Sequence, residues 1–470
     1  MNVVLRYLLS GWILGSLATF GWSLEYRVEP CCRPCPQLGD PASYDTSFLK
    51  MFRTLVSGQD DWLFRSDVEL ATQFGPDGQG YADFGRLVQA FARHDVQLAL
   101  IYQPTRGLMH ADKLNPTDKQ RFAYDVAAGN YAQALAQFRA RGAIVPDFTA
   151  LFGETADPNK DFFFRRDHHW TPYGAETAAK VVADAVKSTT LYRQLPKQEF
   201  STRRSGLIGK RGTLQMAFSR MCGVEFADQY VDEYTTEPTA SSSDAGGLFG
   251  DDALPEVTLV GTSNSRSAVQ LNFDGFLKQY LQTDILNVAK AGAGLDGAML
   301  EYLPSDEFQQ SPPKLLLWEV PSYYSLQDEM FYREAIPLID NGCVGKPTEF
   351  SAQKKTLQPG STEILFNGGG QFRELSSAGL VADIQFSDPN IRELVANVWY
   401  INGRKERVHL ERPAKVSTQG RFLFELKSDP QWRHFKFLSL EVEMPPDYHG
   451  SMTVSAQLCR KNAANQGGMS

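Results

Sequence analysis

The chain has 470 residues, of which 42% are hydrophobic and 22% are charged, and its formal net charge is −8 at pH 7. This length exceeds one ordinary hydrophobic core, so we expect two domains. An acidic protein is a poor candidate for nucleic-acid binding, and a polyanionic ligand would have to be attracted by local arginine patches against the overall field. The totals therefore favour a two-domain globular protein that binds no nucleic acid.

The N-terminus has the pattern of an export signal. Arg6 precedes a charge-free run over residues 7–24, and Gly21-Trp22-Ser23 fits a signal-peptidase site with cleavage after Ser23. The alternative is an uncleaved anchor, because the run comes close to the roughly 20 residues that a spanning helix needs. Its glycines and serines make it a weak anchor, so we expect residues 1–23 to be a cleaved signal peptide.

Six cysteines in an exported chain indicate disulfides. Cys343 and Cys459 bracket the C-terminal portion, and a bridge between them would staple its ends. Cys222 is expected to bond to one of Cys31, Cys32 and Cys35. The alternative for that cluster is a metal knuckle, but it lacks a second ligand pair at the required spacing, and we expect no metal and no cofactor.

Over the first two thirds of the chain, short apolar strands alternate with helices. In order, the sequence predicts a helix over 81–94, a strand over 96–102, a helix over 117–142, a strand over 143–145 and an alanine-rich helix over 174–187. There follow a basic flexible stretch at 199–213, an exposed loop at 237–252, a strand over 256–260, a helix over 266–281, and strands over 284–288 and 314–320. This alternation predicts an α/β fold with a doubly wound, mostly parallel sheet, whose ligand site lies at the carboxyl ends of the strands.

After residue 343 the helical periodicity disappears. Short alternating runs at 362–366, 381–386, 396–401, 407–410, 421–426, 435–443 and 451–458 are separated by turn residues such as Asn402-Gly403. This pattern is typical of an all-β sandwich. We therefore divide the chain into an α/β domain at 24–342 and a β-sandwich domain at 343–470.

The stretch from Asp167 to Gly174 is the strongest candidate for a site. Thr171 is a good N-cap and Pro172 suits the first helical position, so Asp167 and His169 lie in a loop held at a helix start. An aspartate this close can accept from one imidazole nitrogen and leave the other free as a base. We interpret His168 as structural, since adjacent ligands on one metal ion strain the geometry.

A base of this kind needs a nucleophile. Ser263, in Gly261-Thr262-Ser263, lies between the strand predicted over 256–260 and the helix predicted over 266–281. The first N–H groups of that helix could stabilise an oxyanion. The alternative is that Ser263 or Ser265 only caps the helix, and we expect Ser265 to be the cap.

Three further residues follow predicted strands. Arg106 could bind a carboxylate or pair with an internal acid, and both readings stay open. Gly292 could bring backbone N–H groups to an oxyanion or only end a strand, and Tyr323 follows the strand predicted over 314–320.

In the β domain, one hairpin concentrates Trp399, Arg404 and Arg407. An exposed ring beside arginines suits an anionic sugar chain. The alternative is that Trp399 belongs to the core, and alternation places Trp399 and Tyr400 on opposite sides.

Several of these motifs together resemble a known family. Asp167-His168-His169-Trp170-Thr171 is similar to the Asp-x-His-Trp-Thr signature of the periplasmic alginate acetylation proteins, and Gly261-Thr262-Ser263 is similar to their serine block. The entry at Asp61-Trp62-Leu63-Phe64 and the strand end at Trp318-Glu319-Val320-Pro321 are similar as well. A C-terminal β domain with two cysteines is the layout of the two-domain members, and the resemblance covers nearly the whole mature chain.

The resemblance implies an SGNH-hydrolase-like fold, circularly permuted so that the histidine block precedes the serine block. It implies a Ser263–His169–Asp167 triad that forms an acetyl-serine and O-acetylates mannuronate residues of alginate in the periplasm. The β domain would be a carbohydrate-binding module, and Gly292 and Tyr323 would be oxyanion-hole or substrate residues. The usual SGNH asparagine block is not evident, and Asn264 has no counterpart in the family pattern.

The expected partners are alginate, an acetyl donor and other alginate acetylation and export proteins, and we expect a monomer. Two alternatives remain. The same triad serves a carbohydrate acetylesterase, in which water accepts the acetyl group. A non-catalytic alginate-binding scaffold of an export complex would not use the triad at all.

Overall fold

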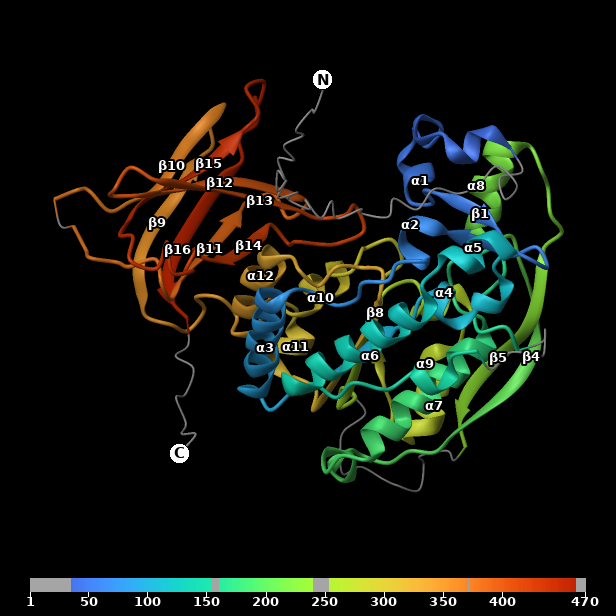
Figure 1. Ribbon diagram of the computed structural model, residues 1–470. Helices are drawn as coiled ribbons and strands as arrows, with labels where there is room; N and C mark the ends of the chain where they lie inside the picture. The colour runs from blue at the N-terminus through green and yellow to red at the C-terminus, as the bar shows by residue number, and fades with distance from the viewer. Residues whose placement is uncertain (1–34, 154–159, 240–252, 371, 462–470) are drawn as a thin grey trace, which may run out of the picture.

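The computed structural model describes residues 35–153, 160–239, 253–370 and 372–461. It consists of an α/β part, to the right in Figure 1, and a β-sandwich, to the left. The predicted signal peptide, Cys31, Cys32 and most of the predicted loop at 237–252 lie outside the described residues. Within the described ranges, no helix combines the length and apolar character needed to cross a membrane.

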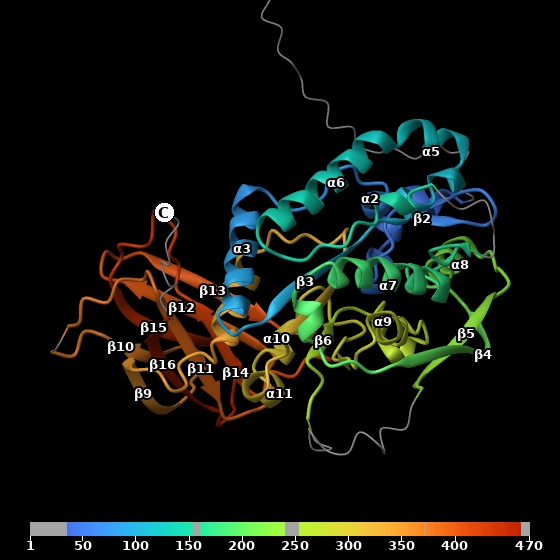
Figure 2. The same cartoon turned by 90° about the horizontal axis from the view of Figure 1, so that it is seen from below.

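The α/β part is built around a parallel sheet with the strand order β3-β8-β6-β7. The strands are β3 (Gln97–Gln103), β6 (Val257–Val260), β7 (Leu286–Asn287) and β8 (Leu315–Pro321). Every residue of β6 and β8 is buried, and strands of this kind need helices on both faces of the sheet. Helices lie on both sides of the sheet in Figure 2, so the predicted doubly wound α/β fold is confirmed.

The helix that follows the histidine loop begins where its capping residues predict. Thr171 caps α7 by accepting a hydrogen bond from the Gly174 amide at 3.0 Å, and Pro172 is the first helical residue, as predicted. The bounds are α1 (Ser47–Lys50), α2 (Ser66–Glu69), α3 (Gly78–Ala92), α4 (Arg106–Met109), α5 (Pro116–Arg121), α6 (Tyr124–Ala140), α7 (Pro172–Lys187), α8 (Thr213–Cys222), α9 (Phe273–Leu281), α10 (Gly297–Tyr302), α11 (Asp306–Gln310) and α12 (Glu329–Ile339).

Two predicted helices are interrupted. The helix expected over 117–142 is divided into α5 and α6, and the strand expected over 143–145 is a single bridge between Ala99 and Ile144. The helix expected over 266–281 is a 3-10 turn, Ser267–Val269, followed by α9. Gln270 and Asn272 interrupt it with φ angles of +63° and +55°, a conformation that no right-handed helix continues.

The stretch predicted to be flexible at 199–213 is mostly a strand, and that prediction was wrong. β4 (Phe200–Lys210) pairs antiparallel with β5 (Gln229–Pro238), and the ribbon runs along one edge of the α/β part in Figure 1. Cross-strand polar pairs hold it, among them Arg204 with Asp232 at 2.6 Å. The partner strand lies beyond α8 in sequence, so local composition gave no sign of the pairing.

The C-terminal part is the predicted all-β sandwich. Two antiparallel sheets with the orders β10-β15-β12-β13 and β14-β11-β16-β9 enclose one apolar core. The strands are β9 (Thr348–Thr356), β10 (Gly360–Phe366), β11 (Leu380–Phe386), β12 (Glu393–Tyr400), β13 (Lys405–Glu411), β14 (Arg421–Glu425), β15 (Phe437–Met444) and β16 (Thr453–Arg460). The first, β9, was missed because its sequence is mostly polar.

Charged pairs and disulfides join these elements. Arg333 on α12 contacts Glu406 of the sandwich at 2.5 Å, and Arg412 of the sandwich is hydrogen-bonded to Glu334 on α12. A disulfide joins Cys343 to Cys459, and another joins Cys35 to Cys222 at the end of α8. Two short strands, β1 (Leu55–Ser57) and β2 (Leu63–Arg65), form an antiparallel pair at the Asp61–Phe64 entry.

Candidate active site

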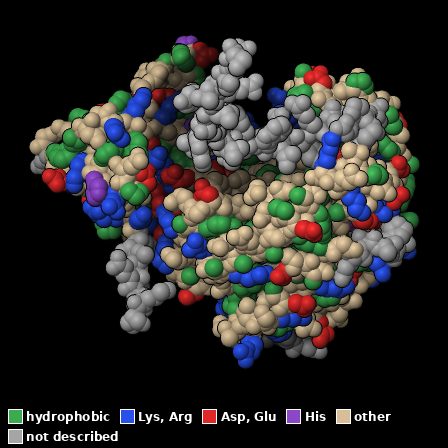
Figure 3. Space-filling view, in the orientation of Figure 1, with side chains coloured by type: hydrophobic (Ala, Val, Ile, Leu, Met, Phe, Trp, Pro, Cys, Tyr) green, Lys and Arg blue, Asp and Glu red, His purple; other side chains and the backbone are tan. Residues whose placement is uncertain are grey.

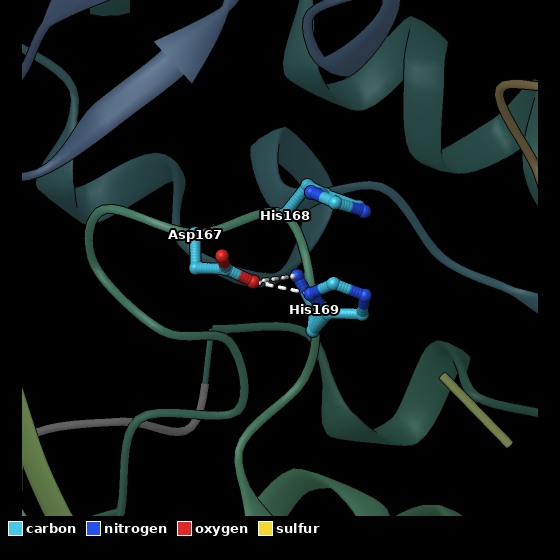
Figure 4. A group of neighbouring side chains, drawn as sticks. All are labelled: Asp167, His168 and His169. Atoms are coloured by element: carbon cyan, nitrogen blue, oxygen red, sulfur yellow. Dashed lines mark hydrogen bonds and ion pairs between the residues drawn. The ribbon is translucent and has the colours of Figure 1, made fainter. Parts of the chain in front are cut away.

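Asp167, His169 and Ser263 form one chain of hydrogen bonds. The Nδ1 atom of His169 is hydrogen-bonded to Asp167 Oδ1, and Nε2 lies 2.8 Å from Ser263 Oγ. Asp167 is fully buried, and His169 is 6% exposed. Figure 4 shows the Asp167 carboxylate directed at the His169 ring, and the His168 ring lies beside the His169 ring, with the two centres 3.9 Å apart. This is the geometry in which an imidazole can take the proton of a serine hydroxyl.

The loop that carries Asp167 and His169 is held by a buried arginine. The guanidinium of Arg106 donates to the carbonyl oxygens of Asp167 at 2.7 Å, Arg165 at 2.9 Å and Leu63 at 2.7 Å, and also to that of Phe164. Glu69 lies 3.2 Å from its Nε atom. Arg106 is 1% exposed, so it does not bind a substrate carboxylate, and the internal pairing left open above is the correct reading.

The turn that carries Ser263 is anchored on Glu319 at the end of β8. One carboxylate oxygen of Glu319 accepts hydrogen bonds from the Thr262 amide at 2.8 Å, the Thr262 hydroxyl at 2.9 Å and the Ser265 hydroxyl at 3.1 Å. A Cβ atom at Gly261 would lie 2.7 Å from the same oxygen, so only glycine fits there. Because the Ser265 hydroxyl donates to Glu319 and α9 begins only at Phe273, the prediction that Ser265 caps a helix was wrong.

The oxyanion prediction needs the same correction. Because α9 begins ten residues after Ser263, helix N–H groups do not lie directly behind the Ser263 hydroxyl as expected. Within the described part of the chain, however, the backbone N–H of Ser263 donates to no other group. That N–H is available to a negative oxygen beside the hydroxyl.

Asn264 and Trp170 join the two halves of the site. The Trp170 indole donates to the Asn264 carbonyl at 3.0 Å, and the Asn264 amide donates to Gln103 at the end of β3 at 3.1 Å. Asn264, which has no counterpart in the family pattern, therefore fixes the serine turn against the histidine loop and the sheet. Sequence reasoning missed the contributions of Glu319, Gln103 and Asn264, because each depends on contacts between segments far apart in the chain.

The surroundings of the triad favour an ionised Asp167 and a neutral His168. Burial alone would raise the pKa of Asp167, but the charge and hydrogen bond of His169 outweigh it and hold that pKa well below its ordinary value. Burial and the nearby His169 hold the pKa of His168 well below its ordinary value. Ligand atoms of Asp167, His168 and His169 lie within 4.8 Å of one another, yet hydrogen bonds already occupy the Nδ1 atoms of both histidines.

Of the two other predicted residues, Tyr323 lies two residues after β8 and Gly292 lies five residues after β7. Tyr323 follows β8, and the Arg65 guanidinium lies 4.5 Å from the centre of its ring. Burial raises the pKa of Tyr323, so its hydroxyl stays protonated. Gly292 has a φ angle of +73°, and its Cα faces Lys415 of the sandwich, which places it at the junction with the sandwich.

Of the three sugar-binding candidates, Trp399 and Arg407 lie on the same face of the sandwich, whereas Arg404 does not. Trp399 pairs with Lys405, and Asn397 pairs with Arg407, so these four side chains share the outer face of β12 and β13, while Tyr400 is buried on the other. Lys405 Nζ lies 5.2 Å from the centre of the Trp399 ring. Arg404, in the turn between β12 and β13, instead lies over the ring of Phe435, which precedes β15. Lysine and arginine side chains are spread among acidic ones over the sandwich surface in Figure 3.

Both parts of the chain match models of known protein families. Residues 55–322 match the family model described as "SGNH hydrolase-like domain, acetyltransferase AlgX". Residues 342–469 match that of a C-terminal carbohydrate-binding module. The chain belongs to the AlgX family. It is 44% identical to the alginate biosynthesis protein AlgX of Pseudomonas fluorescens over 94% of this chain and 91% of that protein.

Solved and curated relatives agree with this assignment. The structure of Pseudomonas aeruginosa AlgX superposes with a TM-score of 0.82 at 40% identity, covering 91% of this chain and 99% of that one. The probable alginate O-acetylase AlgJ of the same organism is 33% identical over 57% of this chain and 70% of its own length. The AlgX family therefore combines an SGNH-like domain related to an acetylase with a carbohydrate-binding module.

Proposed function

We propose that this AlgX-family protein transfers acetyl groups to mannuronate residues of alginate in the periplasm, with Ser263 as nucleophile, His169 as base and Asp167 as its partner. The observation that carries this proposal is the 2.8 Å contact between His169 Nε2 and Ser263 Oγ, with Asp167 on the opposite imidazole nitrogen. The predicted division at 342/343 and the cleaved signal peptide belong to the same proposal.

In the first half-reaction, His169 Nε2 takes the Ser263 proton as Oγ attacks the carbonyl carbon of an acetyl ester or thioester donor. The free Ser263 N–H stabilises the negative oxygen that forms. His169 then returns the proton to the leaving oxygen or sulfur, and an acetyl-serine remains. Asp167 stabilises the imidazolium at each stage, since both of its oxygens accept hydrogen bonds and it is ionised.

In the second half-reaction, a sugar hydroxyl gives its proton to His169 and attacks the acetyl-serine. The acetyl group moves to the sugar oxygen, and Ser263 regains the proton from His169. An acetylesterase differs only in using water as acceptor, so the outcome depends on how completely bound polymer excludes water.

The sandwich would hold the polymer while the triad acts. Trp399, Lys405 and Arg407 share one outer face, where a ring can stack on a sugar and cations can bind uronate carboxylates. Arg407 is paired with Glu443 at 3.0 Å, so a uronate would exchange for that acid. Replacing Trp399 by alanine should weaken oligomannuronate binding in calorimetry without changing ester cleavage.

The test incubates purified protein with p-nitrophenyl acetate and oligomannuronate and analyses the sugar by mass spectrometry. The proposal expects acetylated oligomannuronate from the wild type and none from Ser263→Ala. Ser265→Ala is the matched control, because its hydroxyl is bonded to Glu319, and it should still acetylate sugar. Free acetate without acetylated sugar would establish the esterase, and no Ser263-dependent product at all would favour the scaffold.

A further inference from the structure

The catalytic aspartate has a partner outside the triad. Asp167 Oδ1 accepts from the amide and the ring of His169. Asp167 Oδ2 accepts from the backbone N–H of Thr213, at 2.7 Å and from 46 residues away. Thr213 is the first residue of α8, whose amide has no partner inside the helix.

The start of α8 docks on the triad loop through several bonds. The Gln215 amide donates to the Arg166 carbonyl at 3.1 Å, and the Thr213 hydroxyl lies 2.7 Å from His168 Nδ1. Gly212 lies against the Arg166 carbonyl so closely that a Cβ atom there would collide with it. The Gly212 residue supplies no side-chain cap, so residues 166 and 167 of the triad loop cap this helix in its place.

The other end of α8 is fixed as well. Cys222, its last residue, is bonded to Cys35. Leu214, Ala217 and Phe218 pack with residues of the 38–63 segment in a separate apolar cluster. The helix is therefore anchored independently of the triad loop, and its first N–H is held at a fixed place.

From these contacts we propose that Thr213 is a positioning residue for catalysis: its backbone N–H fixes Asp167 Oδ2, so that Oδ1 is aimed at His169. The role of this contact in turnover rests on the proposed function, whereas its effect on the Asp167–His169 pair does not. A hydrogen bond to a carboxylate stabilises the anion. Without it, Oδ2 is buried and unpaired, and the Asp167–His169 pair holds a proton more tightly.

A backbone donor can be removed here without breaking the helix. Proline lacks the N–H and is favoured at the first position of a helix. Gly212 has φ −70° and ψ 152°, an extended conformation that suits the residue before proline. Thr213→Pro therefore deletes the N–H and the hydroxyl, and its ring carbon Cδ takes the place of the hydrogen, so Asp167 Oδ2 loses this contact. Thr213→Ala deletes only the hydroxyl, and Thr213→Ser keeps both groups.

The experiment measures the titration of His169 by NMR on the intact, 15N-histidine-labelled protein, together with p-nitrophenyl acetate cleavage against pH. Thr213→Pro should raise the apparent pKa of the pair by about one pH unit relative to Thr213→Ala. The cleavage rate at neutral pH should fall about tenfold, with KM little changed. Thr213→Ser should match the wild type in both measurements.

If Thr213→Pro and Thr213→Ala titrate alike, the proposal is overturned. The NMR arm needs no turnover, so a wild type that cleaves no ester counts against the proposed function alone. Should Thr213→Pro not fold, Gly212→Ala replaces it, because its Cβ pushes α8 off the Arg166 carbonyl while the N–H is retained. It should shift the titration in the same direction, and an unchanged titration would again overturn the proposal.

Discussion

The Nε2 atom of His169 lies 2.8 Å from the Oγ atom of Ser263, although 94 positions separate the two residues in the chain. Trp170 explains how this contact is maintained. Its backbone follows His169 directly, and its indole N–H donates to the carbonyl of Asn264, the neighbour of Ser263, at 3.0 Å. The loop that carries His169 and the turn that carries Ser263 are thus bonded to each other beside the contact between these two residues, so their relative position does not depend on the sheet alone.

Replacing Asp167 by asparagine tests the electrostatic part of this account. The side chain keeps its size, but its amide nitrogen must face either the His169 ring N–H or the Thr213 N–H, both of which are donors. We expect ester cleavage to fall by about 10³- to 10⁴-fold with little change in KM, because the histidine loses its tautomer and the stabilisation of its cation. Steady-state kinetics with a circular dichroism control measures this, and an Asn variant with near-normal turnover would contradict it.

Glu319 should matter for the serine turn through its accepting oxygen. In Glu319→Ala, the Thr262 amide and the Thr262 and Ser265 hydroxyls lose their shared buried acceptor. Each unsatisfied group costs about 1–3 kcal/mol, so the free energy of unfolding should fall by about 3 kcal/mol and cleavage should fall with it. Glu319→Gln keeps an acceptor oxygen and should retain most of the stability. Equal losses in the two variants, measured by denaturant titration, would show that the anion itself is required.

Arg106 should be a stability residue. Arg106→Met leaves Glu69 without one of its cations and several buried carbonyls without a donor. Removing one partner of a buried ion pair costs about 3–5 kcal/mol. The midpoint of thermal unfolding should therefore drop strongly, while oligomannuronate affinity of the folded protein should be unchanged. A variant with normal stability and weakened polymer binding would restore the reading of Arg106 as a substrate ligand.

Glu334 should make the stability of the protein depend on pH. Burial raises the pKa of Glu334 to about 7, against the opposing effect of its Arg412 partner. A carboxyl whose pKa is higher in the folded protein than in the unfolded chain stabilises the fold when it is protonated. This contribution is complete below pH 4.5, the ordinary pKa of the group, and is lost as the pH rises towards 7. Relative to Glu334→Gln, the wild type should lose about 3 kcal/mol of unfolding free energy between pH 4.5 and 8. Denaturant titrations across that range measure the difference, and parallel curves would contradict the prediction.

Local signals were enough for the elements that surround the site. The cap at Thr171, Pro172 at the first helical position and the apolar run of β8 are encoded within a few residues, and the alternation of strands and helices then predicts the sheet. The resemblance supplied the pairing of His169 with Ser263, which local patterns only suggested.

The remaining features depend on contacts that no local pattern reveals. β4 is polar and exposed, and it is a strand because β5 pairs with it. Gln270 and Asn272, which interrupt the predicted helix, are hydrogen-bonded to Glu233 and Thr236 of β5. The role of Ser265 depends on its hydrogen bond to Glu319, 54 residues away. Arg106 follows a strand, as a ligand-binding residue would, and only its burial and its hydrogen bonds to backbone carbonyls show that it holds the loop of Asp167 and His169 instead.

The most direct measurement of the central claim is mass spectrometry of the protein quenched in acid after a short incubation with p-nitrophenyl acetate. The account predicts one acetyl group on the peptide that contains Ser263, lost when oligomannuronate is added and recovered on the sugar. It also predicts no acetyl-peptide from Ser263→Ala and little from His169→Ala. Acetylated sugar formed by the Ser263→Ala variant at the wild-type rate, or an acetyl group that reaches the sugar from another residue, would contradict it.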